Sequence, residues 1–236
     1  MSAAADRATT PPRGSNRTWS FVGLAALLAL ILLLVKPDWD VAASALFFRA
    51  GEGFPLAHLP AFTVVIKGLP ILVIGAAIAS GLLGIAATVS HRTWLGITPR
   101  LALYIVLSLA IGPGLLVNTL LKDHWGRARP HQILEFGGAL HFTPVLEFTN
   151  QCARNCSFPS GHGALGFWTV TLAILAPPRW RDWAIILALT VGAMVGLMRI
   201  AQGAHFLSDV LAAALLVVGL NFILKYLILG PHLERV

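Results

Sequence analysis

Residues 101–130 read LALYIVLSLAIGPGLLVNTLLKDHWGRARP. The first part, 101–121, has no charged side chain and is long enough to cross the hydrocarbon core of a bilayer as a helix. The second part begins at Lys122 and also contains Arg127 and Arg129. Cations next to hydrocarbon are costly unless they are paired or functional. This stretch therefore predicts a membrane helix and places chemistry at its end.

The composition of the whole chain agrees with a membrane protein. Of its 236 residues, 57% are hydrophobic and 11% are charged, whereas a soluble domain carries about 25% charged residues. The mean hydropathy is +0.78, which excludes a disordered chain. Six apolar stretches stand out, at 19–35, 62–89, 101–121, 163–176, 183–198 and 210–229. We predict an all-α bundle of six transmembrane helices, the fourth and fifth extended by a more polar turn at one end.

Six spans place both termini on one side of the membrane. Residues 1–18 are predicted as a short disordered tail, 19–229 as the membrane domain and 230–236 as a second tail. The first stretch is predicted to be an anchor, with a cleaved signal peptide as the alternative. Basic residues are equally numerous on both sides, but the loops on the side opposite the termini are longer. The positive-inside rule then favours cytoplasmic termini.

Polar residues gather in three clusters at span ends. The first runs from Lys122 to Pro130, the second is Pro-Ser-Gly-His at 159–162, and the third joins Arg199, His205 and Asp209. In a six-span topology all three face the same compartment, which is predicted to be the periplasm, with the loop 122–161 carrying the first two. The net charge of +7 then indicates membrane topology and an anionic substrate, and no nucleic-acid partner.

The first two clusters suit a phosphate group. Arginine offers a planar fork that matches phosphate oxygens, although a single cation can also simply extend toward the interface. Ser160 can cap a helix whose free N–H groups attract anions, and Gly161 permits close approach of the backbone. An ordinary capped helix with an interfacial histidine is the alternative reading of this second cluster.

The third cluster contains a histidine and an acid four residues apart. On a helix, His205 and Asp209 share one face and can touch. A carboxylate that accepts from one ring nitrogen fixes the tautomer and frees the other nitrogen to attack. A structural hydrogen bond between the two residues is the alternative.

Together the clusters identify a resemblance to the type 2 phosphatidic acid phosphatase family of integral membrane lipid phosphatases. Its signature is Lys-x6-Arg-Pro, Pro-Ser-Gly-His and Ser-Arg-x5-His-x3-Asp, and this chain matches its order and spacing at 122–130, 159–162 and 198–209. One position departs, because Met198 stands where the family has Ser. This puts in doubt a local hydrogen bond and the orientation of Arg199.

The resemblance implies a role for each matched residue. His205 would be the nucleophile that forms a phosphohistidine, Asp209 would orient it, and His162 would protonate the leaving oxygen and then activate water. The phosphoryl oxygens would be held by Lys122, Arg129, Ser160, Gly161 and Arg199. Neither a cofactor nor a metal is implied, since cations supply the charge stabilisation.

The long polar segment 131–155 is expected to cap the site and help select the substrate. Trp125, Arg127 and His141 are candidate headgroup contacts. A periplasmic location favours a disulfide between Cys152 and Cys156, with two free thiols as the alternative. His124, His131 and His141 fit no standard zinc spacing.

The expected partners are the bilayer and a phosphorylated membrane lipid. Lipid A phosphate in a bacterial inner membrane leads, and undecaprenyl diphosphate, phosphatidylglycerol phosphate and phosphatidic acid are alternatives. The same residues could transfer the phosphoryl group to another lipid. A lipid transporter would need internal repeats or broken helices at the midplane, which the sequence lacks, and a halide-oxidising enzyme with a similar phosphate cage would be soluble.

Overall fold

The computed structural model describes the backbone of residues 15–230 and the side chains of residues 23–230. The predicted tails at 1–18 and 230–236 lie almost entirely outside the described residues. The α-helices of the described residues are α1 (Ser15–Val35), α2 (Asp38–Ala45), α3 (Pro60–Ser90), α4 (Pro99–Leu109), α5 (Gly161–Trp168), α6 (Val170–Ala173), α7 (Pro178–Ala201) and α8 (Leu207–Leu229). Helix α4 continues directly as the π-helical segment η2 (Ala110–Leu121). Short 3₁₀ turns are η1 (Pro55–His58), η3 (Pro130–Gln132) and η4 (Leu134–Phe136).

The prediction of an all-α membrane protein is confirmed. Four helical runs among the described residues are long and apolar enough to cross a membrane, namely α3, α4 with η2, α7 and α8. The described apolar part of α1 covers only Gly23–Val35. The predicted fourth span is divided into α5 and α6 at Thr169, whose hydroxyl donates to the Gly166 carbonyl at 2.7 Å. Helix length thus identifies four of the six predicted spans.

Local sequence explains where the spans begin. Pro99 and Pro178 occupy the first positions of α4 and α7, where a missing N–H costs nothing. The Thr98 hydroxyl also caps α4 by accepting from the Leu101 N–H at 3.2 Å. The π-helical segment contains Pro113, which cannot donate to the usual α-helical ladder. It ends with the Lys122 N–H donating to the Val117 carbonyl at 3.1 Å.

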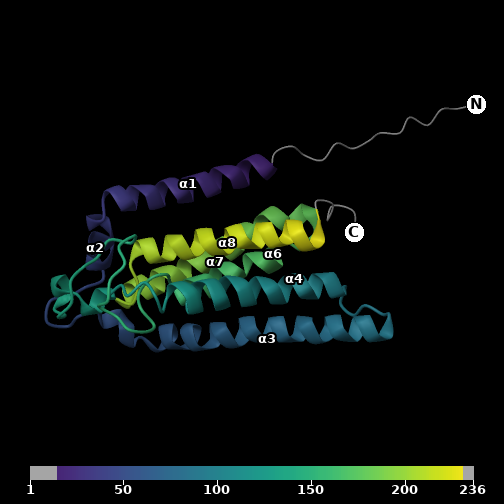
Figure 1. Cartoon of the computed structure of the whole chain (residues 1–236), viewed down its shortest axis with the longest axis horizontal. Coiled ribbons are helices and arrows are strands. Elements are labelled where there is room, and N and C mark those ends of the chain that lie inside the picture. The colour runs from purple at the N-terminus through teal and green to yellow at the C-terminus, as the bar shows by residue number, and fades with distance from the viewer. Residues whose placement is uncertain (1–14, 231–236) are drawn as a thin grey trace, which may run out of the picture.

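Helix α5 lies at the centre of the bundle, packed by α3, η2, α7 and α8. Small residues allow this packing, since a Cβ added to Gly166 would lie 2.9 Å from the Cα of Gly192 on α7. Figure 1 shows the long helices side by side. Helix α2 and the loop between η2 and α5 gather at the end of the bundle away from the start of α1 and the end of α8.

The loop between η2 and α5 folds back on its own beginning. The Thr149 N–H donates to the Trp125 carbonyl at 3.1 Å. Gly126 next to it has φ +71, and a Cβ there would overlap the Thr149 carbonyl, so only glycine fits. The loop is thereby fixed beside the start of α5.

Candidate active site

The structure brings the three sequence clusters to this one end of the bundle. Lys122 follows the end of η2 and is only 6% exposed. Its Nζ would lie 3.1 Å from a Cβ placed on Gly161. The glycine therefore lets the start of α5 approach the ammonium group.

The start of α5 offers donors for an anion. The Ser160 hydroxyl accepts from the Gly163 N–H at 3.2 Å, so Ser160 is the N-cap. His162 lies in the first turn and interacts electrostatically with Arg199, Lys122 and Arg129. A helix N-terminus facing three cations is a strongly positive site.

Two arginines complete the cationic group. An Nη2 hydrogen of Arg129 is donated to the Asn155 carbonyl at 2.6 Å, and Nη1 of Arg199 donates to Gln202 Oε1 at 2.7 Å. The Arg199 Nε is buried and has no hydrogen-bond partner in the described part of the chain. Burial, reinforced by Arg129 and Arg199, lowers the pKa of Lys122 to about 8, and burial also lowers the pKa of Arg129. This concentration of positive charge is suited to a phosphate.

The His205 ring is completely buried and fixed in one tautomer. Its Nδ1 lies 2.7 Å from the Ser157 carbonyl oxygen. A carbonyl only accepts, so Nδ1 carries the proton and Nε2 carries the lone pair. Burial lowers the pKa of His205 to about 3, which keeps the ring neutral, and Nε2 has no hydrogen-bond partner among the described residues. The arrangement presents an available nucleophilic nitrogen.

Asp209 supports His205 less directly than the sequence predicts. Its Oδ2 is 3.6 Å from His205 Nδ1, beyond a hydrogen bond. This oxygen instead accepts from the Ser157 hydroxyl at 2.5 Å and from the Phe206 N–H at 2.8 Å. The position of Asp209 in the first turn of α8 explains this, because the carboxylate also caps the helix.

Arg127 requires a correction, because the structure contradicts a headgroup contact. Its side chain is 0% exposed and forms ion pairs with Asp40 at 2.9 Å and Asp209 at 2.6 Å. A buried guanidinium requires such partners. Because Arg127 is buried with them, its side chain cannot contact a lipid headgroup at the surface.

The two other headgroup candidates have different surroundings. The Trp125 Nε1 donates to the Val145 carbonyl at 2.7 Å, and its ring packs between Phe148 and Phe158. His141 is exposed, with its backbone bonded to Gln151. A headgroup contact therefore stays a prediction for His141.

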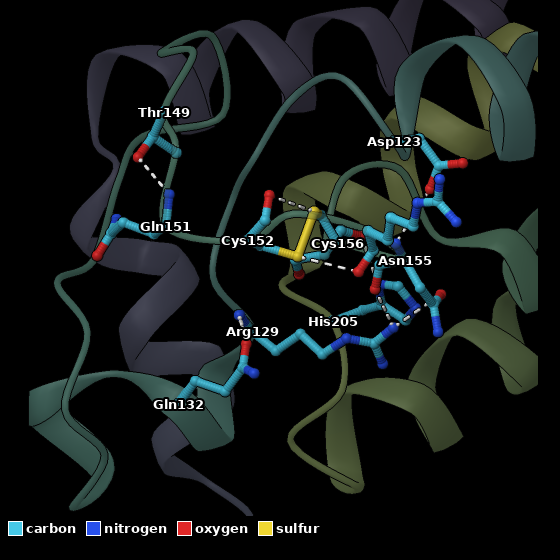
Figure 2. The surroundings of a disulfide bond; sticks show 11 residues. Asp123, Arg129, Gln132, Thr149, Gln151, Cys152, Asn155, Cys156 and His205 are labelled. Carbon is cyan, nitrogen blue, oxygen red and sulfur yellow. Dashed lines mark hydrogen bonds between the residues drawn. A yellow bond between two sulfur atoms is a disulfide. The ribbon is translucent and has the colours of Figure 1, made fainter.

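Cys152 and Cys156 form a disulfide in the structure. Figure 2 shows Arg129 extending toward Asn155 beside this disulfide, with His205 near by. Asn155 has φ +52, and its N–H donates to Asp123 Oδ1 at 3.0 Å. The disulfide loop thus holds the backbone that contacts Arg129.

Two other histidines near the site contact the backbone. The rings of His124 and His131 contact the carbonyls of Leu120 and Gly203, each through Nδ1 at 2.8 Å. Among residues 23–230, no three His, Cys, Asp or Glu side chains are grouped to hold a metal ion.

Ser157, Asn155 and Asp40 belong to the site but were not identified from the sequence. Ser157 and Asn155 act through their carbonyl oxygens, which leave no signal in residue type, and through polar side chains whose partners are distant in sequence. Asp40 did leave one, since a carboxylate beside an apolar run is a candidate for a buried partner.

The sequence pattern of the PAP2 superfamily matches residues 101–229, which contain all three motifs. The chain belongs to the PAP2 superfamily. A PAP2 fold is also indicated by the crystal structure of a transmembrane PAP2 type phosphatidylglycerolphosphate phosphatase from Bacillus subtilis. That structure superposes with a TM-score of 0.56 at 22% identity, covering 90% of this chain and 98% of that one.

The chain is also similar to lipid A 4'-phosphatases from two bacteria. The protein from Francisella tularensis subsp. novicida is 43% identical over 115 residues, which is 48% of this chain and 52% of the relative. The protein from Rhizobium etli is 44% identical over 103 residues, or 44% of this chain and 40% of the relative. The chain thus matches about half the length of these curated relatives.

Proposed function

We propose that this protein is a membrane lipid phosphatase that removes a phosphate group from lipid A through a phosphohistidine on His205. The observation that carries the proposal is the buried, neutral His205 with an unpartnered Nε2. Lys122, Arg129 and Arg199 interact electrostatically around His162 at the same end of the bundle. A nucleophile beside a cationic cradle is what phosphoryl transfer requires.

The chemistry follows in two steps. The Nε2 lone pair forms a bond to phosphorus, and the bond from phosphorus to the lipid oxygen breaks as His162 protonates that oxygen. Water then attacks the phosphohistidine, His162 takes a proton from the water, and the phosphorus–nitrogen bond breaks to release inorganic phosphate. The negative charge on the phosphoryl oxygens is stabilised by Lys122, Arg129, Arg199, Ser160 and the Gly161 N–H. We propose that these groups suffice without a metal or cofactor.

The site is placed at the membrane interface in this proposal. The six spans are the four long helical runs together with α1 and the α5–α6 pair. With six spans, the site lies on the side of the membrane opposite the termini. In a bacterial inner membrane with cytoplasmic termini, that side is the periplasm. A lipid phosphate at headgroup level would then reach Lys122 at the end of η2.

Lipid A is the proposed substrate because the relatives named above are lipid A 4'-phosphatases. Lipid A 1-phosphatases are also similar, such as one from Rhizobium etli that is 41% identical over 100 residues. The 4'-phosphate is therefore the first candidate position, and the 1-phosphate is the second.

Purified full-length protein in detergent tests the proposal with lipid A that carries both phosphates. We expect release of one phosphate in the presence of a chelator, and fragment masses should place the remaining phosphate at the 1-position. His205→Ala should abolish release while its thermal unfolding stays cooperative. Normal turnover by this variant would refute the nucleophile assignment.

A panel of other lipids separates the alternatives. Phosphatidic acid, phosphatidylglycerol phosphate and undecaprenyl diphosphate should be hydrolysed more slowly than lipid A. Faster phosphate release from one of these lipids would make that lipid the proposed substrate, and the proposed phosphohistidine mechanism would be unchanged. Phosphoryl transfer to an added lipid, without inorganic phosphate, would replace hydrolysis by transfer.

A further inference from the structure

Asp40 on α2 is buried against the start of α8. It is 1% exposed, and its Oδ1 accepts from the Ser208 N–H at 2.8 Å. Its Oδ2 accepts from the Ser208 hydroxyl and from Nη2 of Arg127, the latter at 2.9 Å. Two of these contacts are with Ser208, the residue next to Asp209, and the third is with Arg127. Asp40 also precedes the segment that matches the PAP2 pattern, 101–229.

Arg127 connects Asp40 to Asp209 with a single guanidinium group. Its Nη1 donates to Asp209 Oδ1 at 2.6 Å while its Nη2 donates to Asp40. Its Nε donates to the Thr143 carbonyl at 2.9 Å, and its central carbon lies 4.3 Å from the Phe206 ring centroid. The planar fork is thus fixed on all sides.

The charges in this buried group do not cancel. Arg127 contributes one positive charge and Asp209 one negative charge. Asp40 adds a second carboxylate: burial raises the pKa of Asp40, while Arg127 and the hydrogen bonds from Ser208 favour its ionised form. If Asp40 were absent, Arg127 alone would neutralise Asp209. With Asp40 present, the group keeps a net negative charge beside His205 Nδ1, which lies 3.6 Å from Asp209 Oδ2.

That excess charge has a use in the proposed reaction. The His205 ring becomes cationic as Nε2 bonds to phosphorus, and a nearby negative charge stabilises the cation as it forms. Asp40 also fixes the Arg127 fork, which in turn fixes the Asp209 carboxylate. Asp40 makes none of its hydrogen bonds or ion pairs with Lys122, Arg129 or Arg199, so it has no direct part in binding phosphate.

We infer that Asp40 is a positioning residue for His205, acting through Arg127 and Asp209. The inference rests on the proposed function, since it assumes that His205 takes the phosphoryl group. It predicts that loss of the Asp40 charge slows the chemical step and leaves substrate binding almost unchanged.

Asp40→Asn in the full chain tests this directly, with Asp38→Asn as the matched control. Asp38 lies on the same helix with an exposed side chain, so its variant removes the same charge outside the network. For Asp40→Asn we expect kcat to fall about tenfold or more, with KM within about twofold of the wild-type value. Asp38→Asn should match wild type, and rates are normalised to the folded fraction measured by thermal unfolding in detergent.

A second test compares Arg127→Met with the double variant Asp40→Asn/Arg127→Met. In this background the effect of Asp40→Asn on kcat should reverse. Without Arg127, two buried carboxylates face each other unpaired, which is strongly unfavourable. Adding Asp40→Asn to Arg127→Met should then raise kcat or recover folded protein, although it lowers kcat on its own. This comparison also serves if Asp40→Asn alone yields no folded protein.

Three results would overturn the inference. Equal kcat values for Asp40→Asn and Asp38→Asn, or a rate loss fully explained by unfolded protein, would remove the positioning role. If the fractional losses of kcat in the two single variants multiply in the double variant, the two residues act independently, and Asp40 does not act through Arg127. If wild-type protein releases no phosphate from any lipid, the proposed function fails and the inference falls with it, whereas an active wild type isolates a failure of the inference alone.

Discussion

Lys122, which we propose binds phosphate, has a charge that changes within the pH range of an ordinary assay. Its pKa lies at about 8 because of burial and the neighbouring Arg129 and Arg199. In the proposed site the ammonium holds phosphate below that pH, and the contact is lost above it. We expect kcat/KM to fall as one proton is removed above about pH 8, measured from about pH 6 to about pH 10.

Lys122→Arg should move this alkaline limb to higher pH, because a guanidinium stays protonated throughout the range. Lys36→Arg is the control, since Lys36 is exposed at the end of α1, and it should leave the limb in place. An unmoved limb in Lys122→Arg would assign the titration to another group.

Residue type and spacing predict the groups that we propose to contact phosphate, but they do not predict the residues that hold these groups in place. Lys122, Arg129, His162 and His205 stand in fixed intervals within short motifs, so their roles could be proposed from sequence. Arg127 stands in the same motif but pairs with Asp40 and Asp209, 87 and 82 positions away. No local pattern encodes such pairs, because the tertiary fold creates them.

At the level of helices, apolar stretches in the sequence predict the middle of a helix better than they predict its ends. The stretch 183–198 lies inside α7 (Pro178–Ala201), where Pro178 and Arg199 extend it at the polar ends, as expected. The apolar stretch 163–176 contains no hint of the break at Thr169, because threonine is common in both continuous and interrupted helices. The connector 36–59, left unassigned in the sequence, contains α2 and therefore Asp40.

The disulfide loop is the element that we expect to link stability to phosphate binding. The bond between Cys152 and Cys156 closes a short ring around Asn155, which contacts Arg129 through its carbonyl at 2.6 Å and its Oδ1 at 3.1 Å. In Cys152→Ser we expect the free energy of unfolding to fall by about 2 kcal/mol, from the loop-entropy estimate for so short a ring. We also expect KM to rise, because Arg129 loses a fixed partner.

Thermal unfolding and KM, each measured with and without reductant, check this expectation. Reductant should move wild type toward Cys152→Ser and leave Cys152→Ser itself unchanged. Ala153→Ser is the matched control in the same loop, and it should respond to reductant as wild type does. Two thiols that react with an alkylating reagent in native, unreduced protein would contradict the disulfide.

The whole molecule separates an apolar bundle from a polar end. The four long helical runs carry many exposed apolar side chains, such as Ile71, Leu72 and Leu227. The loops that bear Lys122, Arg129, Ser160 and His205 lie together at one end (Figure 1). Low overall charge and a local excess of cations are thus two parts of one arrangement, which supports the proposal that lipid covers the helices and phosphate binds at the loops.

This arrangement predicts which parts of the chain face the periplasm. Single cysteines are introduced as Glu147→Cys or Arg92→Cys, both at exposed positions, after Cys152 and Cys156 are changed to Ser. Glu147 lies in the loop beside the site, and Arg92 lies between α3 and α4 at the other end of α3.

In bacterial cells a membrane-impermeant maleimide should label Glu147→Cys in intact inner membranes. It should reach Arg92→Cys only after lysis, because six spans and cytoplasmic termini put that loop inside. Labelling of both before lysis would contradict six spans, and labelling of Arg92→Cys alone would reverse the orientation and place the site in the cytoplasm.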